Sequence, residues 1–334
     1  MLLYSLAMRT SASHWSTQRL GSLLRQGWSP LVCAVALAVV GPESARAQQM
    51  EPRSYSNAPI GLNFLIAAYQ YSWGDVLLDP SLPVTNANAK VSSVVLGYSR
   101  FLDFWGESGS ISVALPYAWL SANGNVEDQP QSIDRSGFGD GAVRLSVNVY
   151  GAPALSTQEF RDYHQDTIVG ASLLVTAPTG QYYPTKLINI GTNRWSFKPE
   201  VGVSKALGSW ILEGAFGVTF YTDNDEFPGS NFQGNSVRQQ DPLYALQAHV
   251  TYNFNPRLWG ALDWTYYAGG RTAVNGTEKE DLQSNSRWGA TLAQSLDVHN
   301  SIKLYFNSGV YARTGTNFTT VGVAWQYRWG AGLK

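Results

Sequence analysis

Long segments of this chain alternate between apolar and polar residues, and their charged residues fall on only one of the two alternating sets of positions, or parities. This feature most limits what the chain can fold into. In residues 209–221 one parity is apolar, yet Glu213 stands on the other parity in the middle of the run. Successive side chains of a strand point to opposite faces, and burial of an unpaired charge carries a large free-energy cost. A strand buried on both faces is therefore excluded, and its two faces must meet different surroundings. The apolar parity of this segment consists of Trp210, Leu212, Phe216, Val218 and Phe220.

Period-two alternation recurs along the chain and predicts about twelve strands. A globular strand usually has about five or six residues, whereas a strand tilted across a bilayer needs about 9–11. Most of the alternating segments are long enough for the second case. Alternation is weak in the first two, so their register is not predicted. The expected strands cover residues 61–72, 90–102, 110–120, 141–150, 166–178, 194–206, 209–222, 243–254, 257–268, 286–297, 301–313 and 317–329.

The connections between these segments segregate by length. Tight turns follow the segments ending at 206, 254 and 297, while several others are joined by long polar loops. After residue 150, Ser156 and Glu159 form a capping box, which indicates either a short helix or an irregular loop. An even strand number, with short turns at one end and long loops at the other, is typical of an outer-membrane β-barrel.

The fold class expected is therefore all-β: a transmembrane antiparallel β-barrel of the bacterial outer-membrane type, with about twelve strands. A closed barrel pairs every backbone amide without leaving an edge, as lipid requires. A soluble β-sandwich shows the same alternation, but strand length and loop segregation count against it. Aromatic residues near strand ends are expected to form the interfacial girdles; examples are Trp195, Trp210, Tyr221, Tyr244, Phe254, Trp259, Tyr266 and Trp329.

The polar parity supplies the candidate interior. These side chains are expected either to line a pore and set its selectivity or to pair across the lumen and fill it. Eight-stranded barrels are filled by side chains, whereas about 16–18 strands leave an open channel, so twelve strands predict a narrow or gated path. The candidates are Arg144, Asn148, Lys198, Glu200, Glu213, Gln247, His249, Asp263, Arg287, Lys303, Asn307 and Arg328.

The N-terminal region reads as an export signal. Arg9, Arg19 and Arg25 precede the short apolar run 31–40, and Ala45-Arg46-Ala47 offers a cleavage site. This pattern predicts a secretory signal peptide over residues 1–47, cleaved after Ala47; the alternative is an uncleaved anchor. We expect a periplasmic segment over 48–60 and the barrel over 61–330. Cys33, the only cysteine, would leave with the signal, so no disulfide or metal thiolate is expected.

Several runs carry a family resemblance: GFGDGAVRLSVNVYG (137–151), DTIVGASLLVTAPTGQY (166–182), INIGTNRWSFKPEVGVSK (188–205) and LYFNSGVYARTGTNFTTVGVAWQYRWG (304–330). The chain resembles the transporter-like outer-membrane family labelled "putative MetA-pathway of phenol degradation". The resemblance implies an outer-membrane barrel that passes small, often aromatic, compounds. The chain departs from the usual aromatic C-terminus of such barrels, because Trp329 is followed by Gly-Ala-Gly-Leu-Lys.

The function expected is passive diffusion of small hydrophobic or aromatic compounds through a narrow lumen. The alternative is a non-transporting structural or adhesive surface barrel that acts through its long loops. The partners expected are outer-membrane lipid and lipopolysaccharide, the barrel assembly machinery and a small-molecule solute. The net charge of −1 offers no basic field for nucleic acid.

Enzymatic chemistry is not expected. Besides His249, the exported chain has His164 in the short helix or loop and His299 in a tight turn, and no G-x-S-x-G elbow is present. No cofactor or metal is predicted. The acidic loop tip formed by Asp223, Asp225 and Glu226 is interpreted as solvated, with cation binding as the alternative, since its spacing does not match a calcium loop.

Two further motifs lie at strand ends. Tyr182 and Tyr183, in PTGQYYP, are candidates for meeting an aromatic solute at the loop end, or else belong to the girdle. Asp140 of GFGD is expected to make a local Asp-type turn at a strand start.

Overall fold

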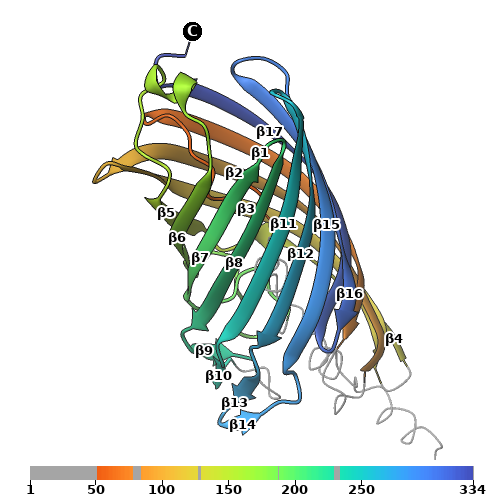
Figure 1. The fold of residues 1–334 in the computed structure, drawn as a ribbon. Helices are drawn as coiled ribbons and strands as arrows, with labels where there is room; N and C mark the ends of the chain where they lie inside the picture. The colour runs from red at the N-terminus through yellow and green to blue at the C-terminus, as the bar shows by residue number, and fades with distance from the viewer. Residues whose placement is uncertain (1–50, 78–83, 127–128, 187, 229–233, 334) are drawn as a thin grey trace, which may run out of the picture.

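The chain forms a closed antiparallel β-barrel of twelve strands (Figure 1). The computed structural model describes residues 51–77, 84–126, 129–186, 188–228 and 234–333, so the predicted signal peptide lies outside the described residues. The barrel strands are β1 (Leu62–Leu77), β2 (Val84–Phe104), β3 (Glu107–Val126), β5 (Ala142–Tyr150), β6 (Thr167–Thr176), β7 (Ser196–Leu207), β8 (Trp210–Tyr221), β11 (Leu243–Asn255), β12 (Leu258–Gly269), β15 (Gln283–Ser295), β16 (Asn300–Ala312) and β17 (Gly315–Gly330).

Closure is made by the first and last strands. β1 pairs with β17 from Leu62 opposite Gly330 to Leu77 opposite Gly315. Each remaining barrel strand pairs antiparallel with its neighbours in the wall. Backbone groups inside a bilayer have no water to bind, and this continuous pairing satisfies them.

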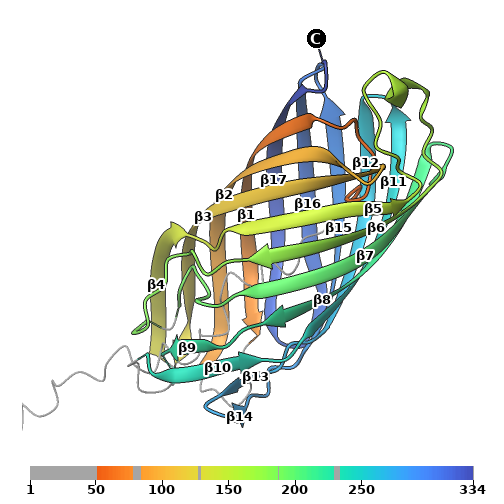
Figure 2. The same cartoon turned by 90° about the vertical axis from the view of Figure 1, so that its left-hand side faces the viewer.

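The two ends of the barrel differ. The turn end, which carries both barrel termini and the short turns, also holds a 3-10 helix at Glu159–Asp162. The loop end holds β4 (Gln129–Phe138) and a separate four-stranded sheet of β9 (Asn224–Phe227), β10 (Ser236–Gln240), β13 (Thr272–Val274) and β14 (Thr277–Glu278) (Figure 2).

The capping box at the turn end is formed as predicted. The backbone N–H of Ser156 donates to Glu159 Oε2 at 2.9 Å, and the Glu159 N–H donates back to Ser156 Oγ at 3.3 Å. The hydrogen bond from the Ser156 hydroxyl lowers the pKa of the Glu159 carboxyl below its ordinary value. The helix is a single short turn of the 3-10 type.

Strand lengths at the loop end differ from the prediction. Residues 121–138 were expected to be a polar loop, but β3 runs to Val126 and pairs with β4 from Tyr117 opposite Phe138 onwards. β5 pairs with the other half of β3, from Gly109 to Ala114. β4 and β5 therefore occupy one place in the wall, and the β3–β4 hairpin extends the barrel beyond the length that a bilayer requires.

The outer face of the barrel wall is largely apolar. The segment of the opening argument is β8, where Leu212, Phe216 and Phe220 are exposed on the outside. Two predicted girdle residues are wrong, because Tyr221 and Trp259 lie on the luminal parity. There the Arg194 guanidinium lies 4.4 Å from the centroid of the Tyr221 ring. The Arg53 guanidinium lies 5.2 Å from the centroid of the Trp259 ring. The large exposed side chains that mark the outer face include Leu96, Leu115, Trp119, Val201, Leu246, Leu262, Leu304 and Trp325.

β1 and β2 alternate weakly because both of their faces are apolar. Outward residues such as Tyr69 and Leu96 are exposed, while inward residues such as Phe64, Ile66 and Val95 are half-buried. The interior therefore has an apolar side. Where the luminal face of a strand is as apolar as its lipid-facing side, the sequence shows no alternation.

Leu262→Arg tests which medium the outer face meets. Leu262 is 63% exposed and lies between Val250 of β11 and Ala290 of β15. Facing lipid, an arginine near mid-depth should cost about 2–4 kcal/mol of unfolding free energy, whereas a leucine exposed to water tolerates the change. Denaturant unfolding in lipid vesicles measures the difference, with Gln239→Arg on the loop-end sheet as the control. An unchanged unfolding free energy for Leu262→Arg would place this face in water.

Candidate functional site: the barrel interior

Glu200 is the centre of the polar side of the interior. It is only 8% exposed and accepts from Lys198 Nζ at 2.8 Å, Arg144 Nη2 at 3.1 Å and Gln247 Nε2 at 3.0 Å. The hydroxyl of Tyr55 donates a further bond at 3.0 Å. A buried carboxylate is tolerated when its lone pairs are satisfied in this way.

A second polar group links β11, β12 and β15. His249 Nδ1 lies 2.7 Å from Asp263 Oδ1, and Thr291 Oγ1 donates to Asp263 Oδ2 at 3.2 Å. All three side chains are buried. The carboxylate stands between the imidazole and the hydroxyl, so this is not a nucleophile held by a base, which requires the two to bond directly.

The remaining predicted residues are held by separate partners. Arg287 Nη2 donates to Asn307 Oδ1 and to the carbonyl of Phe318. Lys303 Nζ pairs with Glu51 Oε1 at 2.6 Å. Polar groups on this side of the lumen are therefore engaged largely with one another.

Two predicted residues lie close to the turn end. Asn148 is buried and donates to Ser108 Oγ at 2.9 Å. Arg328 donates from Nε to the carbonyl of Val298 in the β15–β16 turn. Arg328 thus lies at the rim, away from the group around Glu200.

The other side of the interior is apolar. Its wall is built mainly by β1, β2 and β3, where half-buried apolar side chains keep some exposed surface. Leu174 of β6 adds an apolar side chain between Arg144 and Lys198. On the polar side, by contrast, Gln247, Asp263 and Arg287 are buried. Free surface in the lumen follows the apolar wall. Its members include Phe64, Ile66, Ala68, Val95, Ala114, Pro116 and Leu174.

The chain segment before β1 enters the lumen. The backbone N–H of Arg53 donates to Glu213 Oε2 at 2.7 Å, and Glu51 pairs with Lys303. Tyr55 is 4% exposed and bonds Glu200. The prediction of a periplasmic segment over 48–60 therefore does not hold for residues 51–55, because Glu200, Glu213 and Lys303 of the wall bind them inside the barrel.

Two glycines make room for this segment. A Cβ at Gly170 would lie 2.1 Å, and one at Gly202 2.3 Å, from ring atoms of Tyr55. Any side chain at either position would displace the ring, so both strands are shaped for it. Sequence analysis missed this contact, although glycine at two facing luminal positions of β6 and β7 is the signal that marks it.

At the loop end, the connection between β6 and β7 folds inward. Ile188 and Ile190 are buried against Ala89, Leu120 and Phe318. This apolar cluster narrows the mouth of the barrel on the side of β2 and β3. The loop thus opposes the N-terminal segment, which lies at the turn end.

Asp140 clamps this loop. Its Oδ1 accepts from the backbone N–H of Gly180 at 2.8 Å and its Oδ2 from that of Thr192 at 3.0 Å. The expectation of a local Asp-type turn is wrong, because the carboxylate joins two segments that are distant in sequence. Gly180 and Gly191 meet so closely there that a Cβ on Gly191 would lie 2.6 Å from the Gly180 carbonyl carbon.

The two candidate tyrosines belong to loop contacts. The Tyr182 hydroxyl donates to the carbonyl of Glu226 at 3.1 Å, and the Lys186 ammonium lies 4.2 Å from the Tyr183 ring centroid. In the acidic loop, Asp223 accepts from Gln239 at 3.1 Å. Within the described residues, no group of three or more His, Cys, Asp or Glu is arranged to hold a metal ion.

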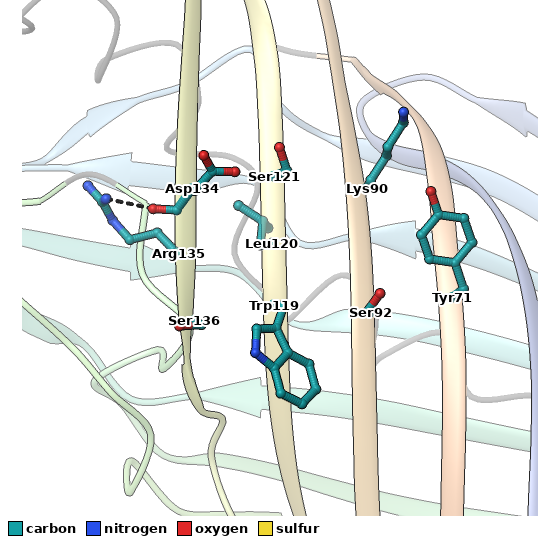
Figure 3. Close-up of a pocket in the computed structure, with 9 residues that line it drawn as sticks. All are labelled: Tyr71, Lys90, Ser92, Trp119, Leu120, Ser121, Asp134, Arg135 and Ser136. Atoms are coloured by element: carbon teal, nitrogen blue, oxygen red, sulfur yellow. Dashed lines mark hydrogen bonds between the residues drawn. The ribbon is translucent and has the colours of Figure 1, made fainter.

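A cavity of about 440 Å³ lies on the outer face rather than in the lumen (Figure 3). Lys90, Ser121 and Asp134 are consecutive partners across β2, β3 and β4, and Trp119 lies beside them. Polar groups next to an exposed tryptophan are typical of the membrane interface. The lining residues are Tyr71, Lys90, Ser92, Trp119, Leu120, Ser121, Asp134, Arg135 and Ser136.

Comparison with known families gives a match over most of the barrel. The model of the family described as "Putative MetA-pathway of phenol degradation" matches residues 78–328. The chain belongs to this family. A search of curated proteins found no significant match. None of the helices in the described residues is long and apolar enough to cross a membrane.

Solved structures show the same fold. The COG4313 outer membrane channel from Pseudomonas putida F1 superposes with a TM-score of 0.71 at 21% identity, covering 84% of this chain and 100% of that one. The transport unit of the autotransporter AIDA-I from Escherichia coli gives a TM-score of 0.51 at 8% identity, covering 90% and 99%. At these identities the likeness concerns the barrel architecture, and both relatives are outer-membrane barrels.

Asp140→Asn should loosen the loop-end mouth. An asparagine keeps the shape but turns an N–H₂ donor toward one of the two backbone amides, and an unsatisfied buried amide costs about 1–3 kcal/mol. We expect a lower unfolding free energy in denaturant and a larger single-channel conductance. Asp134→Asn, on the outer face of β4, is the matched control. Equal conductance for both variants would show that the clamp does not set the mouth.

Deleting residues 51–57 should widen the turn end. The deletion removes the Tyr55 ring and the contacts to Glu213 and Lys303, so ion conductance of the reconstituted barrel should rise severalfold. Tyr55→Ala should give a smaller rise, because the rest of the segment stays. A conductance unaffected by the deletion would contradict the view that this segment occupies the ion path.

Proposed function

We propose that this protein is an outer-membrane channel through which small hydrophobic or aromatic compounds diffuse passively. The observation that carries the proposal is the division of the lumen. Polar side chains on one side are engaged with each other, while half-buried apolar side chains line the other. An apolar solute can contact this wall without breaking a hydrogen bond, whereas a hydrophilic solute must compete with established bonds.

Family membership and fold support the proposal. The description of the family refers to a pathway of phenol degradation. The structure superposes on an outer-membrane channel of Pseudomonas putida. The predicted pore-lining residues then act in two ways: Glu200, Gln247, His249 and Asp263 hold the polar side rigid, and Arg144 and Lys198 border the path.

The rest of the cellular setting follows from the barrel type. We propose export through a signal peptide cleaved after Ala47, assembly by the barrel assembly machinery, and a lipopolysaccharide outer leaflet around the loop end. The turn end faces the periplasm, as in other bacterial barrels. No enzymatic step is part of the proposal.

A second candidate is an adhesive barrel, favoured by the four-stranded sheet that stands beyond the wall at the loop end (Figure 2). Deleting residues 223–241 separates the two functions. Lost cell attachment with unchanged permeability supports adhesion. Unchanged attachment with altered flux supports transport.

Uptake of an aromatic solute tests the channel directly. Vesicles containing the folded mature protein should take up phenol faster than protein-free vesicles, and Ala114→Glu, which places a carboxylate on the apolar wall of β3, should slow the uptake. Ser121→Glu on the outer face of the same strand is the control. Uptake at the rate of empty vesicles, with the barrel shown to be folded, would rule out the proposal.

A further inference from the structure

Arg144 has hydrogen-bonding capacity that the fold does not use. Its Nη2 donates to Ser172 Oγ at 3.0 Å and to Glu200 Oε1 at 3.1 Å, and its guanidinium lies 5.7 Å from the Tyr55 ring centroid. Within the described residues, Nε and Nη1 have no protein partner. The side chain is 26% exposed, so these donors can reach the lumen.

The charges around Arg144 do not balance. Arg144 and Lys198 both pair with Glu200, and this carboxylate is the acid that both share. Asp263 lies against His249, and Glu213 accepts from the backbone N–H of Arg53, so neither carboxylate pairs with Arg144 or Lys198. The group of Arg144, Lys198 and Glu200 therefore carries one positive charge in excess, and it lies beside the apolar wall. A partly desolvated charge is stabilised by an anion that reaches it.

The apolar wall begins next to these cations. Arg144 is in register with Ser112 of β3 and with Leu174 of β6, and Leu174 is in turn opposite Lys198. One and two rows toward the loop end, β3 presents Ala114 and Pro116, both half-buried. A molecule lying along this wall would place one end at the guanidinium and its body on apolar side chains.

We propose that this part of the lumen is a binding site for small amphipathic carboxylates, such as aromatic monocarboxylic acids. The carboxylate accepts a charge-assisted hydrogen bond from a free donor of Arg144, Nε or Nη1, and Lys198 adds charge. The hydrocarbon body lies against Leu174, Ala114 and Pro116. This inference rests on the proposed channel function and names the solute class for it.

Three solutes test the site: benzoate, benzyl alcohol and benzyltrimethylammonium. Each has one aromatic ring, and their polar groups are an anion, a neutral hydroxyl and a cation. Each is added at neutral pH to the full mature protein in a planar bilayer, and the concentration that half-blocks the potassium chloride current is measured. Because a hydrogen bond to a charged group strengthens binding by roughly tenfold or more, benzoate should block at a concentration about tenfold below that of benzyl alcohol. The cation should block least.

Arg144→Gln should abolish the preference for benzoate over benzyl alcohol. Arg144→Lys keeps the charge but replaces the guanidinium, with its separate free donors, by a single ammonium, so it should retain only part of the preference. Lys90→Gln, on the outer face, is the control and should behave as wild type. If Arg144→Gln fails to fold, the order of the three solutes on the wild-type channel still decides.

Equal block by all three solutes, or strongest block by the cation, would overturn the carboxylate site. Failure of the site and failure of the channel are distinguishable. If phenol uptake exceeds that of empty vesicles while benzoate shows no preference, only the site is wrong. If neither phenol uptake nor any block is seen, the channel function fails with it.

Discussion

Pairing of the first strand with the last is the interaction on which the rest of this structure depends. Backbone N–H and C=O groups left unpaired in hydrocarbon cost several kcal/mol each, so a sheet of this kind is stable in lipid only when closed. β1 and β17 close it along their full length, from Leu62 and Gly330 to Leu77 and Gly315. Closure separates the lumen from the lipid. The parity of a residue along its strand then decides whether its side chain faces the lumen or the lipid.

Closure also creates an interior in which charges must find partners. Attraction between charges buried there is stronger than in bulk solution. Glu200 illustrates the result, since four donors from β5, β7, β11 and the N-terminal segment converge on one carboxylate. The same networks that stabilise these charges fill the polar side of the lumen, so the space left for a solute lies beside the apolar wall.

The outer face could be predicted from the sequence because lipid imposes a strict rule on it. Strand number and the luminal position of residues such as Glu213 and His249 follow from that rule. The inner face obeys no such rule: Trp259 and Tyr221 sit there as readily as at a membrane interface, and Phe64 and Ile66 make β1 look unpatterned. Asp140 was misread because its partners, Gly180 and Thr192, are brought to it only by the folded loop.

The N-terminal segment is part of the barrel's design rather than a tail that happens to lie in it. Gly170 and Gly202 leave room for the Tyr55 ring, where even a methyl group would collide with it. A glycine inside a strand weakens the strand, so two facing glycines carry a cost that the seated ring offsets. The Tyr55 hydroxyl in turn donates to Glu200, which binds Arg144 through Nη2, while Nε and Nη1 of Arg144 have no protein partner among the described residues. Packing of a segment outside the wall thus determines which polar groups inside it remain available to a solute.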